Sequence, residues 1–377
     1  MSEGLDKVRF SELSGFGGEG CCLSVSCLKD EAIHQYCEPV QSGSRHSLEV
    51  ISLFSGAGGL DLAAEMTGAI RTGARLEIQP EYCETLRRAQ ADGHLQPAPL
   101  FEEDIRTVSV PDIWRSVSKS DVPRGVIGGP PCETFSTMGK SQGVKDPRGT
   151  LLMAFADFVI KSQADFFVLE NVPPMETAAK GTVFRDLVGS FTDAGFTVSH
   201  QVLNAADYGA ATLRRRLFVV GVRSGPSFVF PMPTHSPDGM FGLPWVGAGA
   251  ALAGLPAPTE DPPGIPSGHY LIKHRPEVVR RFSTVAPGSY DYVRRRSRLT
   301  LEDPSVSLVA GTLSGARAHI HPTEHRELTL RECARIQGFS DDFHFSGGHA
   351  AVSKQIANAV PIQLGFAITR SLVDRSW

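Results

Sequence analysis

The sequence has no long apolar run and no large excess of charge of either sign, and both absences narrow the class of protein. No stretch approaches the roughly 18 apolar residues of a membrane-spanning helix, and the first residues, Met1 to Asp6, do not resemble a secretory signal. Seven cysteines in 377 residues are an odd number, which favours reduced thiols over a disulfide framework. We therefore expect a cytoplasmic globular protein with two or three domains, or one large domain with an insert.

Internal repeats, low-complexity tracts and paired cysteine ligands are missing as well. Cys21, Cys22, Cys27 and Cys37 crowd the beginning of the chain, but without the C-x2-C spacing and following histidine pair of a zinc finger. We therefore predict no metal site, and we interpret residues 1–48 as an N-terminal extension of unknown role or a small regulatory cap.

The net charge of −4 originates in the first 50 residues, which hold four basic and eight acidic side chains. The rest of the chain carries 33 of each. Within that balanced part, residues 271–300 hold eight lysines and arginines against two acids. This local excess favours a phosphate-binding surface, and a solvated arginine face is the alternative.

Short apolar runs alternate with helical patterns from residue 49 to residue 224. We predict strands at 50–54, 76–78, 125–128, 166–170 and 217–222, and helices at 60–66, 81–90 and 151–162. This order is typical of a mostly parallel sheet with helices on both faces. Proline and glycine dominate residues 225–268, which favours loops and short strands, and helical pattern returns at 329–337 and 354–372.

A glycine-rich turn follows the first predicted strand and reads Phe54-Ser55-Gly56-Ala57-Gly58-Gly59-Leu60. Glycines at this place let the backbone approach a nucleotide-like ligand, and the acidic Glu77 at the second strand suits ribose hydroxyl groups. Because the turn reads G-x-G-G and not the G-x-G-x-x-G of a dinucleotide site, a tight turn without a ligand is the alternative.

Three further motifs place reactive side chains at strand ends. Cys132 follows the stiff run Gly128-Gly129-Pro130-Pro131, which suits an exposed nucleophile, with an incidental loop cysteine as the alternative. Glu170, in Glu170-Asn171-Val172-Pro173, can hydrogen-bond a ring nitrogen when it is desolvated, or simply cap its loop. Arg214 and Arg216 alternate beside the last strand, so both face the same way, towards a phosphate, a base carbonyl or solvent.

These motifs, in this order and spacing, resemble the DNA cytosine-5 methyltransferases of bacterial restriction-modification systems. Further similarity lies in Glu102-Glu103-Asp104-Ile105, in the helical run from Arg326 to Phe339, and in the run from Gln355 to Pro361. The resemblance covers about residues 49–223 and 300–375. It implies an α/β, Rossmann-like, S-adenosylmethionine-dependent methyltransferase sheet with an inserted, smaller, loop-rich target-recognition domain.

The resemblance also implies a division of the chain and roles for its residues. The catalytic and cofactor-binding domain would begin at 49–224, be interrupted by a target-recognition domain at 225–300, and be completed by 301–377. Residues assigned to S-adenosylmethionine are Phe54, Ser55, Gly56, Ala57, Gly58, Gly59, Leu60, Glu77, Asp104, Ile105, Pro130, Asn358 and Ala359. The catalytic residues would be Cys132, Glu170, Arg214 and Arg216, and those contacting the DNA would be Ser136, Asn171, Arg294, Arg296 and Arg298.

The implied reaction is methylation of carbon 5 of a cytosine flipped out of a specific duplex DNA sequence, through a covalent bond between Cys132 and carbon 6. The implied protein is a cytoplasmic, nucleoid-associated monomer whose partner is double-stranded DNA, with a cognate restriction endonuclease in the same system.

The chain departs from the family pattern at three places, where Glu133, Ala211-Thr212 and Ala357 replace Gln, Pro-Gln and Gly. Glu133 adds a negative charge beside the thiol, which would raise its pKa and slow the reaction. Alternatives are methylation of cytosine in RNA, for which the Cys-Phe-Thr signature is missing, and a non-catalytic DNA-binding homologue. A flavin or nicotinamide oxidoreductase would rest on the glycine turn alone and would not use Cys132.

Overall fold

The computed structural model describes residues 47–117, 121–131, 149–240, 242–259, 268–271, 273–308 and 319–377. The chain divides into two compact units, Met1–Gln41 and Ser42–Trp377. All the described residues belong to the second unit.

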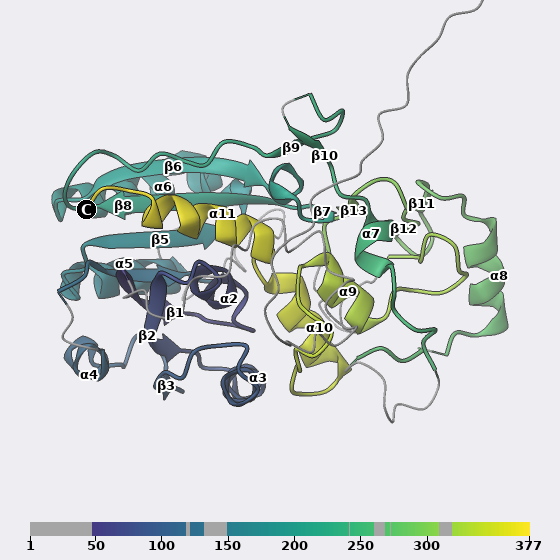
Figure 1. Ribbon diagram of the computed structural model, residues 1–377, viewed down its shortest axis with the longest axis horizontal. Helices are drawn as coiled ribbons and strands as arrows, with labels where there is room; N and C mark the ends of the chain where they lie inside the picture. Colours follow the sequence, from purple (N-terminus) through teal and green to yellow (C-terminus); the bar gives the residue numbers. More distant parts are fainter. Residues whose placement is uncertain are drawn as a thin grey trace, which may run out of the picture. The chain divides into compact units, whose positions relative to one another are not determined.

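A seven-stranded sheet forms the centre of this unit, in the order β3-β2-β1-β4-β5-β8-β6 (Figure 1). Its strands are β1 (Leu48–Leu53), β2 (Ile70–Leu76), β3 (Leu100–Phe101), β4 (Arg124–Gly128), β5 (Phe166–Asn171), β6 (Thr197–Asn204) and β8 (Arg215–Val222). The first five strands in that order run parallel, whereas β8 is antiparallel to both β5 and β6. The prediction of a mostly parallel α/β sheet is therefore confirmed.

β1, β4, β5 and β8 lie within about two residues of predicted strands, whereas β2, β6 and the two-residue β3 do not match a prediction. All residues of β1 and β5 are buried, as expected for strands covered on both faces. The prediction of a strand at 76–78 is wrong, because β2 spans Ile70–Leu76 and ends just before Glu77. Its sequence, IRTGARL, contains two arginines and a threonine and has no apolar run. The polar edge strand β6 was not predicted at all, since most of its side chains are at least partly exposed.

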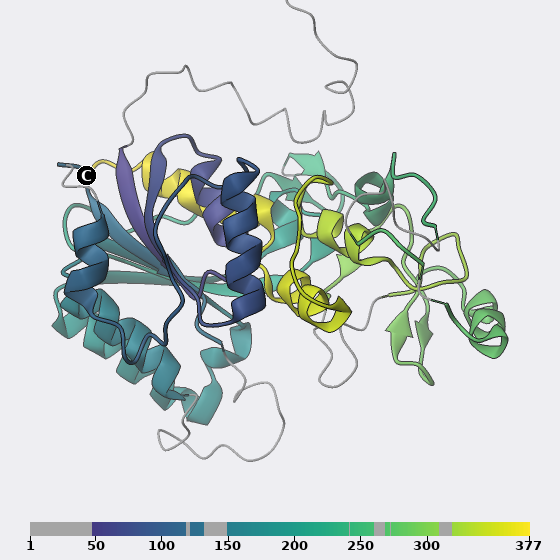
Figure 2. The same cartoon turned by 90° about the horizontal axis from the view of Figure 1, so that it is seen from below.

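Helices cover both faces of the sheet, with α11 on one side and α5 and α6 on the other (Figure 2). One face packs against α4 (Val110–Ser116), α5 (Gly149–Lys161) and α6 (Thr182–Asp193). The opposite face packs against α2 (Gly59–Glu65) and α11 (Ile362–Val373). The alternation of side chains along each strand explains this, since Val50 belongs to one core cluster and Ile51 to the other.

The predicted helical stretch at 354–372 is two helices, α10 (His349–Asn358) and α11, which meet at a 42° bend. Pro361 stands at the break, where it has no N–H to continue the helical ladder. No single helix in the described ranges is long and apolar enough to cross a membrane. The bent pair α10 and α11 is long and apolar enough only when the two helices are taken together. Most of its apolar side chains are buried in the protein core.

The remaining elements are short and connect the sheet to a more irregular region. They are β7 (Thr212–Leu213), β9 (His235–Ser236), β10 (Leu243–Pro244), α7 (Ala248–Leu252), α8 (Pro276–Thr284), β11 (Tyr290–Asp291), β12 (Arg296–Ser297), β13 (Ser305–Val306) and α9 (Leu330–Ile336). The expected loops and short strands are seen in the described part of 225–268, apart from α7. A core cluster joins α7, α9 and α10 to α3 (Pro80–Ala91).

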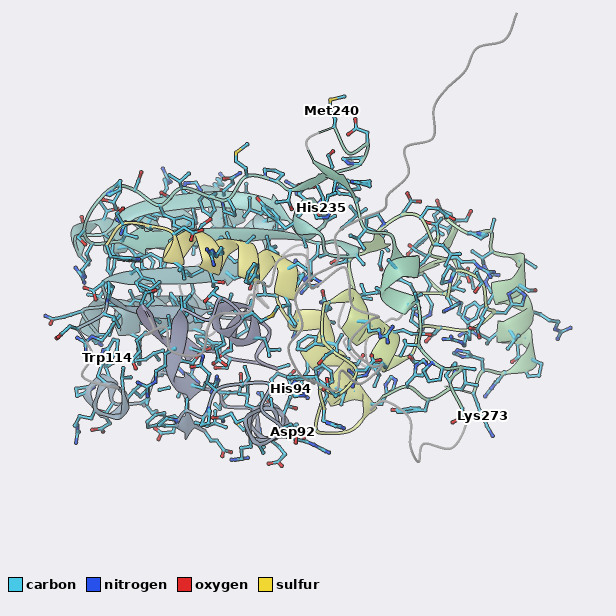
Figure 3. The ribbon with its side chains drawn as sticks, viewed as in Figure 1. Asp92, His94, Trp114, His235, Met240 and Lys273 are labelled. Atoms are coloured by element: carbon cyan, nitrogen blue, oxygen red, sulfur yellow. The ribbon has the colours of Figure 1, made fainter. Side chains whose placement is uncertain are left out.

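The C-terminal segment also contacts the chain just beyond α3, where Figure 3 labels Asp92 and His94. His94 Nε2 lies 3.2 Å from the carbonyl oxygen of Asp342, and its ring lies 5.4 Å from that of Phe343. These contacts hold the segment that follows α9 against the segment that follows α3.

Candidate active site

The turn after β1 has an unusual backbone, in which Phe54, Gly56 and Gly58 have φ values of 53°, 58° and 81°. Positive φ is ordinary for glycine but an outlier for a bulky residue such as phenylalanine, and such strain concentrates at ligand sites. The Ser55 N–H donates to the carbonyl oxygen of Leu76 at 3.2 Å, so the turn is fastened to the end of β2. The predicted glycine turn is thus held at the carboxyl edge of the sheet.

The carboxylate of Glu77 closes this turn from the other side. Its Oε2 accepts a hydrogen bond from the Gly56 N–H at 2.8 Å, and its Oε1 accepts from the N–H groups of Ile78 and Gln79, both at 2.9 Å. Burial raises the pKa of Glu77, and these hydrogen bonds oppose that shift. Since a carboxylate accepts about four hydrogen bonds, three internal ones leave capacity for a hydroxyl group of a ligand.

A buried ionic cluster supports the turn from behind. Arg75 is fully buried, and its Nε donates to Asp61 Oδ1 at 3.0 Å while its Nη2 pairs with Glu65. Asp61 in turn accepts from Ser52 Oγ at 2.9 Å, and Ser52 Oγ accepts from Ser55 Oγ at 2.9 Å. This cluster has no direct signal in the sequence, because Ser52, Asp61, Glu65 and Arg75 come from β1, α2 and β2, and only Ser55 belongs to the glycine turn.

The segment after α10 lies against the same turn. A Cβ atom added to Gly59 would lie 2.9 Å from the Val360 carbonyl oxygen and 3.3 Å from Ala359 Cβ. The close approach therefore requires glycine at position 59, and it places Ala359 beside the turn as predicted. Asn358, the last residue of α10, is exposed.

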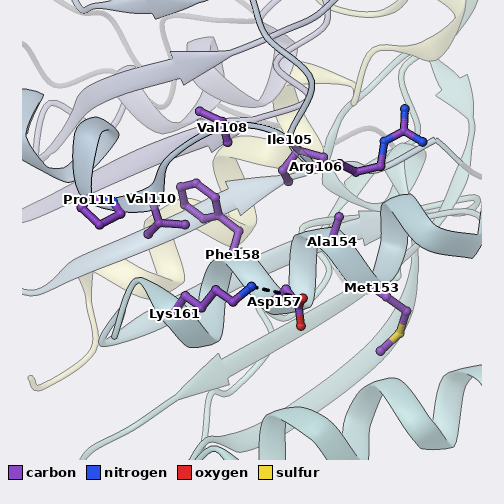
Figure 4. A pocket seen from close by; sticks show the side chains of 10 residues that line it. All are labelled: Ile105, Arg106, Val108, Val110, Pro111, Met153, Ala154, Asp157, Phe158 and Lys161. Atoms are coloured by element: carbon purple, nitrogen blue, oxygen red, sulfur yellow. Dashed lines mark hydrogen bonds and ion pairs between the residues drawn. The ribbon is translucent and has the colours of Figure 1, made fainter.

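Asp104 and Ile105 follow β3 at the same edge of the sheet. The carboxylate of Asp104 accepts two hydrogen bonds from Arg106 Nε, at 2.9 and 3.0 Å, and these hold the pKa of Asp104 below its ordinary value. Ile105 lines a cavity of about 690 Å³ between this segment and α5 (Figure 4). Apolar side chains form most of its wall, and an ion pair between Asp157 and Lys161 lies at its border.

Glu170 and Arg216 form an ion pair where β5 and β8 lie side by side. Glu170 Oε1 lies 2.7 Å from Arg216 Nε, and only 10% and 13% of the two side chains are exposed. Burial raises the pKa of Glu170, while the positive charges of Arg216 and Arg214 oppose the shift. The predicted grouping of Glu170, Arg214 and Arg216 is therefore seen in space.

Arg214 is the more deeply buried of the two arginines. Its Nη1 donates to the Leu308 carbonyl oxygen at 3.1 Å, and its Nε has no hydrogen-bond partner among the described residues. Burial lowers the pKa of Arg214 to about 9, which the neighbouring charge of Arg216 reinforces and that of Glu170 opposes. The guanidinium thus retains donor capacity at neutral pH.

Asn171 links the Glu170 strand to the loop that leads to the predicted nucleophile. Its Nδ2 donates to the Pro130 carbonyl oxygen at 3.1 Å, and its Oδ1 accepts from the Val172 N–H at 2.8 Å. The nitrogen and the oxygen of this amide both make hydrogen bonds within the protein, as expected of a residue that positions the loop. Cys132, Glu133 and Ser136 lie outside the described residues.

Gly129 belongs to this site, although its role cannot be read from the sequence. A Cβ atom at position 129 would lie 2.8 Å from Glu170 Oε2. The glycine-proline run in the sequence signals a stiff loop, but not that its second glycine makes room for the carboxylate.

We expect Gly129→Ala to displace the Glu170 carboxylate from Arg216. The rate of the DNA methylation that the family resemblance implies should then fall by up to about 100-fold, as small misplacements of reacting groups cause. An assay with labelled methyl donor measures the rate, and thermal unfolding shows whether the fold persists. Gly189→Ala in α6 is the matched control, because nothing lies within 4 Å of its added Cβ. Full activity of Gly129→Ala would contradict the assigned geometry.

The three arginines assigned to DNA differ in their surroundings. Arg294 is exposed, whereas Arg296 Nε pairs with Glu327 at 2.5 Å. Arg298 is 6% exposed, and its guanidinium donates to the carbonyl oxygens of Phe282 and Pro322 among others. We therefore withdraw Arg298 from the DNA-contacting set, because its donors hold together segments of the protein.

Comparisons with known proteins show the family to which the chain belongs. A family model described as C-5 cytosine-specific DNA methylase matches residues 48–239 and 269–374. The Type II methyltransferase M1.HphI of Haemophilus parahaemolyticus is 33% identical over 344 residues, 87% of each chain. The Type II methyltransferase M.FnuDI of Fusobacterium nucleatum is 30% identical over 357 residues, which cover 87% of this chain and 94% of that protein.

Solved structures share the fold. A prophage-encoded E. coli protein, whose crystal structure was assigned as a DNA modification methyltransferase, matches with a TM-score of 0.70 and 27% identity over 87% of this chain and 99% of that one. Spodoptera frugiperda DNMT2, in a mutant form, matches with a TM-score of 0.56 and 17% identity over 87% of this chain and 99% of that one, which concerns the fold alone. The seven-stranded sheet and its glycine turn define a Rossmann-like, S-adenosylmethionine-dependent methyltransferase fold. The chain belongs to the C-5 cytosine-specific DNA methylase family, and is thereby a DNA (cytosine-5-)-methyltransferase of the restriction-modification type.

Proposed function

We propose that this enzyme methylates carbon 5 of a cytosine that is flipped out of a specific duplex DNA sequence, through a covalent bond between Cys132 and carbon 6. The observation that carries the proposal is the buried pair of Glu170 and Arg216. Asn171, the neighbour of Glu170, is hydrogen-bonded to Pro130, which precedes Cys132 by two residues in sequence. A buried acid whose strand is hydrogen-bonded to the segment before a cysteine nucleophile suits addition to an aromatic ring.

The residues around the glycine turn fit S-adenosylmethionine. Glu77 keeps acceptor capacity for ribose hydroxyl groups, Ile105 offers an apolar surface for the adenine, and Ala359 lies against the turn from the C-terminal segment. When bound, S-adenosylmethionine supplies an electrophilic methyl group. We assign the turn, Glu77, Asp104, Ile105, Pro130, Asn358 and Ala359 to its binding.

Glu170 is assigned to the ring nitrogen N3 of the cytosine. Because burial raises its pKa, the carboxyl group holds a proton at higher pH than an exposed glutamate does. It can then donate to N3 as the Cys132 thiolate forms its bond to carbon 6, which relieves the negative charge that develops on the ring. Carbon 5 becomes electron-rich and accepts the methyl group. Loss of the carbon-5 proton then releases the thiolate.

Arg216 and Arg214 are assigned to positioning. Arg216 fixes the carboxyl group through the 2.7 Å contact, and Arg214 has an Nε donor without a partner in the described chain. A base in a duplex is out of reach inside the stack, so the cytosine must leave it to meet these groups.

The experiment that tests the function is methyl transfer to duplex DNA by Cys132→Ser, with Cys27→Ser outside the family match as the control. We expect no detectable methylation for Cys132→Ser and full activity for Cys27→Ser. A duplex with 5-fluorocytosine should trap the wild-type protein covalently, because fluorine cannot leave as a proton does. Near wild-type activity of Cys132→Ser, or transfer to tRNA in place of duplex DNA, would refute the proposal.

Other features remain proposals that follow from the family. We assign residues 225–300 to target recognition between the two catalytic parts, 49–224 and 301–377. We expect a monomer that acts on double-stranded DNA at the nucleoid, with a cognate restriction endonuclease in the same system.

A further inference from the structure

The hairpin formed by β11 and β12 carries an exposed apolar tip. Its strands pair Tyr290 with Ser297 and Asp291 with Arg296, so residues 292–295 form a four-residue loop. Tyr292 is 82% exposed and Val293 is 70% exposed. In Figure 2 the hairpin is the pair of short light-green arrows beside α8. Adjacent apolar side chains that are so exposed on a loop tip indicate a surface that meets a partner.

The tip is held in one conformation by a buried carboxylate. Asp291 is 2% exposed, and its Oδ1 accepts hydrogen bonds from the N–H groups of Val293, at 2.9 Å, and Arg294, at 3.2 Å. Arg281 on α8 anchors this carboxylate from below, since its Nε lies 2.9 and 2.8 Å from the two oxygens. The ring of Tyr292 packs edge-on against that of Tyr290, with centroids 5.0 Å apart. An exposed loop fixed in this way is preorganised for contact.

Positive charge surrounds the apolar tip. Arg294 and Arg295 follow Val293 directly and are exposed, and Arg280 is exposed on the neighbouring α8. The tip therefore combines two apolar side chains with cations on one side, and no acidic side chain lies within the loop. A polyanion with apolar groups in its interior matches this surface, and duplex DNA is such a polymer, with phosphates outside and base edges in the grooves.

A two-stranded hairpin fits the major groove of DNA better than the minor groove. The major groove of B-DNA is about 12 Å wide and admits a two-stranded β-ribbon, whereas the minor groove is only about 6 Å wide. Apolar side chains in the major groove contact the thymine methyl group, while arginines bind phosphates or guanine.

We propose that the β11–β12 hairpin enters the major groove of the substrate DNA, where Tyr292 and Val293 contact base edges and Arg294 and Arg295 bind the phosphate backbone. Asp291 and Arg281 are positioning residues that hold the tip. The inference rests on the proposed function in that its partner is the DNA substrate. Tyr292 and Val293 then read the base sequence, in place of the arginines at 294, 296 and 298 that the family resemblance implied.

The test compares Tyr292→Ala/Val293→Ala with Met66→Ala, which removes an exposed apolar side chain (39%) at the end of α2, outside the residues assigned to target recognition. Fluorescence anisotropy measures binding to a duplex library, and sequencing of the methylated products gives the sequence context. We expect the tip variant to bind about tenfold more weakly and to lose preference at one or two base pairs, as removal of base contacts does. The control should keep both properties, and both proteins should unfold at the wild-type temperature.

The arginines and the positioning pair should give different signatures. Arg294→Gln/Arg295→Gln should weaken binding equally on all sequences and reduce the slope of log affinity against log salt by about 2. Asp291→Asn, which keeps its shape but loses the ion pair with Arg281, should give part of the loss of the tip variant. Arg281→Lys should retain more specificity than Arg281→Met.

Unchanged affinity and context in the tip variant would overturn the inference, as would a wild-type protein that does not bind duplex DNA. Loss of self-association or of protein binding, with unchanged DNA affinity, would also overturn it and assign the tip to a protein partner. If the wild-type protein binds duplex DNA through the tip but does not methylate it, the proposed function fails while the inference stands.

Discussion

Replacing Glu170 with glutamine should lower the single-turnover rate of methyl transfer to duplex DNA by about 10²- to 10⁴-fold, the usual contribution of a positioned acid. Glutamine has nearly the same shape, but it cannot transfer a proton to N3, and it removes the negative charge from the contact with Arg216 Nε at 2.7 Å. The rate is measured with saturating labelled methyl donor, so that a change in cofactor affinity does not enter.

The matched control is Glu176→Gln, a glutamate soon after β5 whose Oε1 lies 3.2 Å from His200 Nδ1. It should keep the wild-type rate. Thermal unfolding of both variants shows whether the loss reflects chemistry, because removal of Glu170 leaves the buried Arg214 without its neutralising acid. A Glu170→Gln protein within tenfold of the wild-type rate would refute the acid role.

The pH dependence of the rate gives a second signature of Glu170. Since burial raises its pKa, the protonated form persists above the range of an exposed glutamate. Activity that uses this form falls as the pH rises through the raised pKa, on the alkaline side of the profile. The glutamine variant should lack that decline, and a profile with the same decline in both proteins would assign it to another group.

The second large effect concerns stability. Arg75→Met removes the only cation seen to pair with the buried carboxylates of Asp61 and Glu65 in the described chain. We expect the free energy of unfolding to fall by about 3–5 kcal/mol, because an uncompensated buried charge costs that much. Urea unfolding measures the change, and Arg87→Met on α3 is the control, since its ion pairs are exposed and worth about 1 kcal/mol or less.

This loss should depend on pH with a defined sign. Burial raises the pKa of Glu65 to about 7 from an ordinary value of 4.5, and it also raises the pKa of Asp61. An acid with a raised folded-state pKa contributes stability at low pH that is lost as the pH rises from the unfolded to the folded value. Without Arg75 both pKa values rise further, so the deficit should be larger at pH 8.5 than at pH 6. An equal deficit at both would indicate lost packing and not charge.

A compensating variant separates the two causes. Arg75→Met/Asp61→Asn/Glu65→Gln removes both acids together with the cation and should recover much of the lost stability. If the triple variant is no more stable than Arg75→Met, the unpaired carboxylates are not the reason for the loss.

The order of motifs in the sequence was sufficient to predict much of the fold and the grouping at the site. β1, β5 and β8 have long apolar runs, and each was predicted to within about two residues. The family resemblance groups Glu170 with Arg214 and Arg216 at the target base, and the structure brings Glu170 and Arg216 into contact. Local hydrophobicity decides these features, because a strand buried on both faces needs apolar side chains throughout.

The tertiary structure alone decided the features whose partners are distant in sequence. β2 contains two arginines that would exclude it from a buried sheet, yet Arg71 pairs with Glu49, and Arg75 with Asp61 and Glu65. Arg298 looks like its neighbour Arg294 in the sequence, but only Arg298 is enclosed by main-chain carbonyls.

The sequence by itself therefore determined the α/β class, the family and the residues proposed for chemistry, since these depend on local patterns and motif order. Only the tertiary structure decided which polar side chains are satisfied inside the protein and which remain free for a ligand. The physical reason is that the cost of burying a charge depends on the groups that surround it in space, and these come from segments that the sequence separates.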